Sequence, residues 1–174
     1  MKNITSTLVI RREAVLTFVV LLGIAIAAPL VKQQYITGTI VNAMLLIGTA
    51  WLGVRDGLLL GLIPSSMALA AGMLNPALAP MLPFIIISNA ILVLTFSYLS
   101  KFNYWLGAVT AALLKFGFLY GTSSIVTGLL LDERLAPSVA NMMSWPQLVT
   151  ALAGGIVAFG TITLLKRYQP NKID

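Results

Sequence analysis

Six long apolar segments, separated by short polar stretches, follow one another along the chain. They lie at 14–31, 39–54, 57–73, 81–99, 104–131 and 146–165. Each is continuously apolar, and their lengths of 16 to 28 residues bracket the roughly 20 residues that a helix needs to cross a bilayer. Transmembrane β-strands would instead alternate apolar and polar residues. The pattern therefore predicts an all-α integral membrane protein, with one domain over residues 1–174 made of six transmembrane helices.

Short polar linkers, a proline and small residues within or between these segments predict a turn, a kink, a short helix and close helix packing. The second and third segments share the tight linker Val54–Gly57, which predicts a helical hairpin that turns at one membrane face. Pro64 predicts a kink in the second helix of this hairpin. The stretch Ser138–Trp145 predicts a short interfacial helix, with its Trp at the level of the lipid headgroups. Small residues at Gly23-x-x-x-Ala27 and Ala153–Gly155 predict close packing between helices.

The basic residues predict how the chain is oriented in the membrane. Six crossings place both termini on one side, and eight of the 11 Lys and Arg residues lie on that side. Lys32 and Arg134 lie on the other side, and Lys115 lies inside the fifth segment. Because cytoplasmic loops carry an excess of Lys and Arg, we expect both termini to be cytoplasmic. A cleavable signal peptide ending at Ala25-Ile26-Ala27 is the alternative for the first segment, and Pro29 argues against it.

Composition agrees with a membrane protein and excludes several kinds of chemistry. The chain is 59% hydrophobic and only 9% charged, with a mean hydropathy of +0.96, whereas soluble domains carry about 25% charged residues. It contains no Cys and no His, no acidic residue inside an apolar segment, and no P-loop motif. We therefore expect no enzyme activity, no catalytic residues, no metal site and no cofactor. The scattered basic residues do not form a nucleic-acid-binding patch, so no nucleic-acid partner is expected.

Polar residues inside the apolar segments are the candidate functional residues. Lys115 lies near the middle of the fifth segment, where a Lys costs about 2.5–3.5 kcal/mol on insertion scales. It is either a cationic site that faces a cavity or ligand, or a structural Lys bonded to carbonyls or lipid headgroups. Asn89 and Asn42 lie inside the fourth and second segments, where an amide either contacts a ligand or joins helices by hydrogen bonds.

Three further candidates lie near the outer membrane face. Trp145 and Gln147 begin the sixth segment, where they are placed to line the mouth of a pocket. Trp145 equally suits the aromatic belt at the membrane interface. Tyr35 belongs to the first outer loop. The predicted substrate-binding set is Lys115, Asn89, Gln147, Trp145, Asn42 and Tyr35.

Two strings add a family resemblance to this pattern. Thr37–Ala43 (TGTIVNA) opens the second segment, and Leu82–Asn89 (LPFIIISN) opens the fourth. Together with a small six-helix architecture, termini inside and elaborated outer loops, they resemble the substrate-binding S components of energy-coupling-factor (ECF) vitamin transporters.

The resemblance implies a function and a set of partners. An S component sits in the plasma membrane of a prokaryote and captures a vitamin or related micronutrient from outside. It docks on a transmembrane scaffold subunit that is joined to two cytoplasmic ATPases. The resemblance also implies ligand contacts for Lys115, Asn89 and Gln147. A self-sufficient small secondary transporter or channel is the alternative function.

Overall fold

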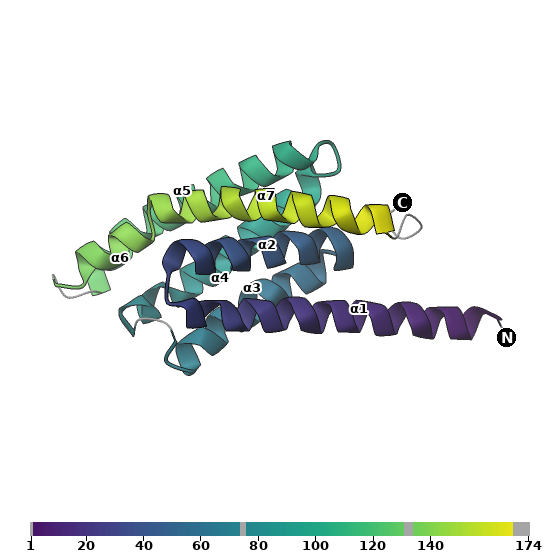
Figure 1. Ribbon diagram of the computed structural model, residues 1–174. Coiled ribbons are helices and arrows are strands. Elements are labelled where there is room, and N and C mark those ends of the chain that lie inside the picture. The colour runs from purple at the N-terminus through teal and green to yellow at the C-terminus, as the bar shows by residue number, and fades with distance from the viewer. Residues whose placement is uncertain (1, 74–75, 131–133, 169–174) are drawn as a thin grey trace.

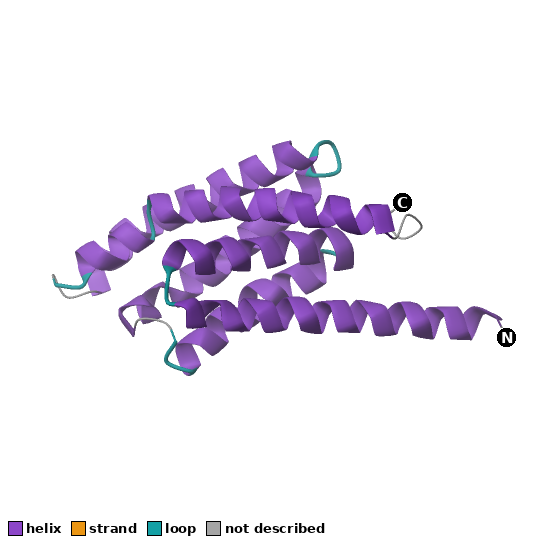
Figure 2. Cartoon of the chain, in the orientation of Figure 1, coloured by secondary structure: helices purple, strands orange, loops and turns teal. Residues whose placement is uncertain are grey.

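Helices make up all of the regular secondary structure in the part of the chain that the computed structural model describes, residues 2–73, 76–130 and 134–168 (Figure 2). The long helices are α1 (Lys2–Ala27), α2 (Gln34–Leu52), α3 (Val54–Ala70), α4 (Leu82–Leu99), α5 (Tyr104–Leu130) and α7 (Trp145–Tyr168). The short elements are the helix α6 (Ala136–Met142) and the 3₁₀ turns η1 (Ala28–Val31) and η2 (Pro76–Met81). The predicted all-α fold is confirmed.

Five stretches of the described helices are long and apolar enough to cross a membrane. They are Arg12–Val31, Gln34–Leu52, Leu78–Leu99, Tyr104–Leu129 and Ala136–Arg167. The remaining long helix, α3, has 17 residues and spans about 26 Å, somewhat less than the roughly 30 Å of a bilayer's hydrocarbon core. A helical membrane protein is therefore supported by length and composition, while the crossing by α3 remains a prediction.

The α2–α3 hairpin turns one residue earlier than the sequence suggested. Gly53 alone separates the two helices, with φ of +99°, a backbone conformation that favours glycine. The expected linker Val54–Gly57 instead forms the first turn of α3. Pro64 lies inside α3, and the Ser65 hydroxyl after it donates to the Gly61 carbonyl at 3.3 Å. The helix thus continues through the proline.

The expected short helix is present as α6, which begins two residues earlier and ends three residues earlier than predicted, while its position at the membrane interface stays a prediction. Its first turn contains Pro137, which fits there because the first helical residues need no intrahelical N–H bond. The helix α6 ends at Met142, and Trp145 begins α7 rather than closing α6. The short break between them brings the chain back into the bundle.

The helices are arranged so that α1 begins and α7 ends at the same end of the bundle, while η1, η2 and α6 gather at the opposite end (Figure 1). We call the latter the loop end. The helix α2 lies in the interior and contacts α7, α3 and α1. Its Leu45 and Leu46 are buried with Leu60, Leu92 and Phe96 in the main apolar core.

Small residues have different roles in α7 and α1. A Cβ added at Gly154 would lie 2.7 Å from Asn42 Cβ and 2.9 Å from the Ala43 backbone nitrogen, so glycine permits the close approach of α7 to α2. A Cβ added at Gly23 would meet nothing within 4 Å. The packing predicted at Gly154 is therefore confirmed, whereas the packing predicted at Gly23 was wrong for the described chain, because no described element covers that face of α1.

Candidate ligand-binding site

Lys115 is the centre of a buried polar network that joins three helices. Its side chain comes from α5 and is only 4% exposed. Its Nζ donates to Asn42 Oδ1 on α2 at 2.6 Å and to Asn89 Oδ1 on α4 at 2.7 Å. Both amides lie inside apolar helices and are themselves buried. The three polar residues that interrupt three separate apolar segments thus meet at one point.

Each amide makes a second contact through its nitrogen, and for Asn89 this contact fixes the orientation of the amide. Asn89 Nδ2 donates to the Gly61 carbonyl at 3.0 Å, and a carbonyl can only accept, so the amide oxygen has to face Lys115. Asn42 Nδ2 donates to Thr150 Oγ1 on α7 at 3.4 Å. The network therefore extends to α3 and α7, and every buried side-chain N or O of the described residues has a hydrogen-bond partner.

A cavity of about 500 Å³ lies beside this network, within the range of known small-molecule pockets. Its polar lining includes Lys115, Asn42, Asn89, Gln147, Gln33, Gln34, Thr37, Ser65 and Lys32. Its apolar lining includes Met73, Met142, Met143, Leu78, Ile85, Val41, Pro29 and Pro64. None of the described residues that line it is Asp or Glu.

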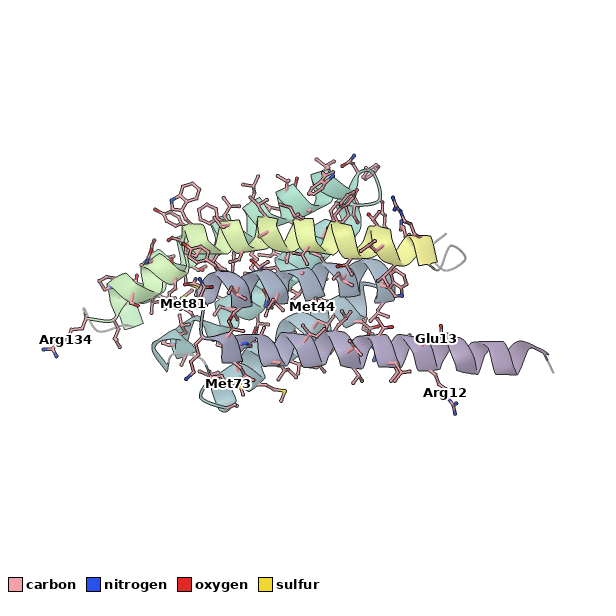
Figure 3. The ribbon with its side chains drawn as sticks, in the orientation of Figure 1. Arg12, Glu13, Met44, Met73, Met81 and Arg134 are labelled. Atoms are coloured by element: carbon pink, nitrogen blue, oxygen red, sulfur yellow. The ribbon has the colours of Figure 1, made fainter. Side chains whose placement is uncertain are left out.

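The cavity reaches the surface at the loop end of the bundle. Lys32 and Gln33, which follow η1, and Met73, which follows α3, are lining residues with exposed side chains. Figure 3 shows Met73 and Arg134 toward this end, whereas Arg12 and Glu13 lie toward the other end. Beneath the network, the apolar core that contains Leu45 and Phe96 fills the interior of the bundle. The cavity is therefore a pocket with a mouth at the loop end.

Two glutamines hold α6 beside the pocket. Gln34 Nε2 and Gln147 Nε2 both donate to the Met142 carbonyl, at 2.7 Å and 3.1 Å. This carbonyl lies at the end of α6, so α2 and α7 fix where the short helix stops. Gln34 was not among the predicted site residues. The adjacent polar pair Gln33-Gln34 between two apolar segments was the available signal.

The structure brings four of the six predicted site residues together at the pocket: Lys115, Asn89, Asn42 and Gln147. Trp145 and Tyr35 are outside its lining and are 66% and 49% exposed. The Trp145 ring stacks on Phe116, with centroids 5.3 Å apart, on the outer surface of the bundle. Thr150, which the sequence analysis missed, lies one helical turn after Gln147 and supports Asn42 from below.

The polar side chains that line the pocket are those of Lys, Asn, Gln, Ser and Thr. Within the described residues, no group of three or more His, Cys, Asp or Glu side chains comes together to bind a metal ion. The pocket offers ammonium and amide donors, amide oxygens and apolar surface instead. This chemistry suits an organic small molecule.

Comparisons with protein-family models, with curated proteins and with solved structures found no match for this chain. The functional argument therefore rests on the geometry of the site.

Proposed function

We propose that this chain is the membrane-embedded substrate-binding (S) component of an ECF-type uptake transporter, which captures a vitamin or related micronutrient from outside the cell. The observation that carries the proposal is the pocket at the loop end, with Lys115, Asn42 and Asn89 at one wall. A buried Lys held by two oriented amides is costly in a membrane helix, and intramembrane charges of this kind usually serve a function.

The distribution of basic residues gives the orientation of the bundle in the membrane under this proposal. Arg55, Lys101, Lys166 and Arg167 lie at the end of the bundle where α1 begins and α7 ends. Among the Lys and Arg residues that the structure describes, only Lys32 and Arg134 belong to the loop end. By the positive-inside rule the loop end faces outward, with α3 as a short sixth span and both termini in the cytoplasm. The pocket mouth would then face the medium, as capture from outside requires.

The proposal includes partners because the chain offers no energy source of its own. Its sequence contains no P-loop motif that would bind ATP. We therefore place it on a transmembrane scaffold with two cytoplasmic ATPases, in the plasma membrane of a prokaryote. A channel needs a continuous path across the bilayer. The apolar core beneath the pocket therefore favours an ATPase-coupled S component over an autonomous channel.

Affinity purification from native membranes, followed by an uptake assay, tests this proposal. We expect a tagged chain to co-purify with a membrane scaffold and two ATPases. Uptake of the bound compound should stop when the ATP-binding motif of those ATPases is mutated, while binding to the chain persists without ATP. Accumulation by the chain alone in proteoliposomes, without ATP, would contradict the proposal and favour a self-sufficient transporter.

A further inference from the structure

We infer that the pocket selects a compact organic monoanion, such as a carboxylate with an apolar body, and holds its negative group at Lys115. This inference rests on the proposed capture function and adds the chemical class of the substrate. It depends on three properties of the pocket: an uncompensated cation, a donor left for a ligand, and an apolar wall.

The pocket carries a positive charge both at its inner wall and at its mouth. Lys115 lies at the inner wall, and Lys32 lies at the mouth. No Asp or Glu is among the described residues that line the pocket. Because electrostatic interactions are stronger where water is excluded, a buried ammonium with only amide neighbours favours an anion over a cation.

The hydrogen bonds of Lys115 leave room for one more acceptor. An ammonium has three N–H donors, and the two amide oxygens accept two of them. The remaining donor is available to the pocket that Lys115 lines. The amides of Asn42 and Asn89 keep their oxygens toward Lys115, because an ammonium can only donate, and their NH₂ groups contact Thr150 and Gly61. One buried positive charge with one free donor matches a single negative charge.

The rest of the pocket indicates an apolar body on the ligand. Met73, Met142 and Met143 line it together with Leu78 and Ile85. Methionine side chains adapt to irregular shapes, and their sulfur atoms contact aromatic rings favourably. A simple inorganic anion would leave this surface unfilled.

The substitution Asn42→Asp tests the charge without a change in shape. The new carboxylate keeps an oxygen for Lys115 Nζ, and its second oxygen faces the Thr150 hydroxyl. This hydroxyl now donates to the Gln147 carbonyl at 3.2 Å and can turn its one proton to the carboxylate instead. Asn89→Asp is less suitable because its second oxygen would face the Gly61 carbonyl. Asn42→Asp should therefore fold while it neutralises the site.

Asn103→Asp is the matched control. The Asn103 Oδ1 accepts the backbone N–H groups of Trp105 and Leu106 at 2.8 Å and 3.1 Å, at the start of α5. Aspartate caps a helix as well as asparagine does. The control adds the same charge at the opposite end of the bundle from the pocket, so its effect on affinity should stay within about twofold.

The probes are 3-phenylpropionate, 3-phenylpropanamide and 3-phenylpropylammonium, titrated against the purified protein. We expect the wild type to prefer the carboxylate, and Asn42→Asp to lower its affinity for that probe about 30-fold or more. The comparison of the three probes on the wild type shows whether the pocket prefers an anionic, a neutral or a cationic ligand, even where Asn42→Asp fails to fold. Equal or tighter binding of the amide or the ammonium, or no binding of the carboxylate, would overturn the inference.

The outcomes separate this inference from the transport proposal. ATPase-dependent uptake of a neutral or cationic compound would overturn the anion class and leave the proposed function in place. Carboxylate binding that is sensitive to Asn42→Asp, in a chain with no ATPase partner, would support the anion site and overturn the transport function.

Discussion

At the scale of single residues, the site depends on polar groups whose positions the sequence reveals but whose contacts it does not. Lys115, Asn42 and Asn89 are conspicuous because each interrupts an apolar run. Their meeting depends on which face each helix turns inward, and the contacts join residues 73 and 26 positions apart. The sequence therefore predicted Lys115, Asn42 and Asn89 as candidate site residues. The geometry of the network that they form, and the support from Thr150, came only from the packed structure.

A double-mutant cycle tests whether Lys115 and Asn89 stabilise each other. Asn89→Leu keeps the approximate size of the side chain but removes an acceptor from Lys115 and a donor from the Gly61 carbonyl. We expect it to cost about 1–3 kcal/mol in the free energy of unfolding, because both groups remain buried.

The double variant Asn89→Leu/Lys115→Met should recover part of that loss, with a coupling of about 0.5–3 kcal/mol. Thermal or denaturant unfolding in detergent measures both values. Strictly additive effects would show that the two side chains do not depend on each other.

At the scale of elements, sequence patterns located the helices well and their ends less well. The hairpin turn falls at Gly53 and not at the polar pair that follows, because the positive φ of a single glycine is enough to reverse the chain. The helix α6 starts at Ala136 because Pro137 is favoured in a first turn. The bond from Gln34 to the Met142 carbonyl joins residues 108 apart, and no local pattern reveals it.

The α2–α7 contact provides a prediction at this scale. Gly154→Ala should lower the melting temperature, since the added methyl meets Asn42 Cβ and backbone atoms of α2 at about 3 Å or less. The overpacking cost is about 1–3 kcal/mol.

Gly160→Ala on the same helix is the control, because a Cβ there meets nothing within 4 Å. It should be neutral or slightly stabilising, since alanine favours helices over glycine. Equal effects of the two substitutions would argue against a close α2–α7 crossing.

At the scale of the whole molecule, the count and order of apolar segments predicted the all-helical bundle. The sequence indicated several residues of a pocket but not its full lining, because residues of all the long helices and of η1, η2 and α6 contribute to it. The hydropathy of each segment carries no information on which residues of separate helices meet.

The orientation of the bundle can be tested cleanly because the chain contains no Cys. Asn141→Cys adds a thiol on α6 at the loop end, and Lys101→Cys adds one between α4 and α5 at the other end. Both positions are exposed. A membrane-impermeant maleimide should label Asn141→Cys in intact cells. It should label Lys101→Cys only after the membrane is permeabilised. The reverse labelling would invert the proposed topology and place the pocket mouth in the cytoplasm.

Native mass spectrometry of the wild type beside Lys115→Met tests most directly the claim that this pocket captures a small molecule. Lys115→Met keeps side-chain length and removes the buried cation, so we expect it to insert and remain folded. The wild type, released from mild detergent, should carry a bound small molecule that is absent from the folded variant. The same bound compound at equal occupancy in both proteins, or none on the wild type, would contradict the account.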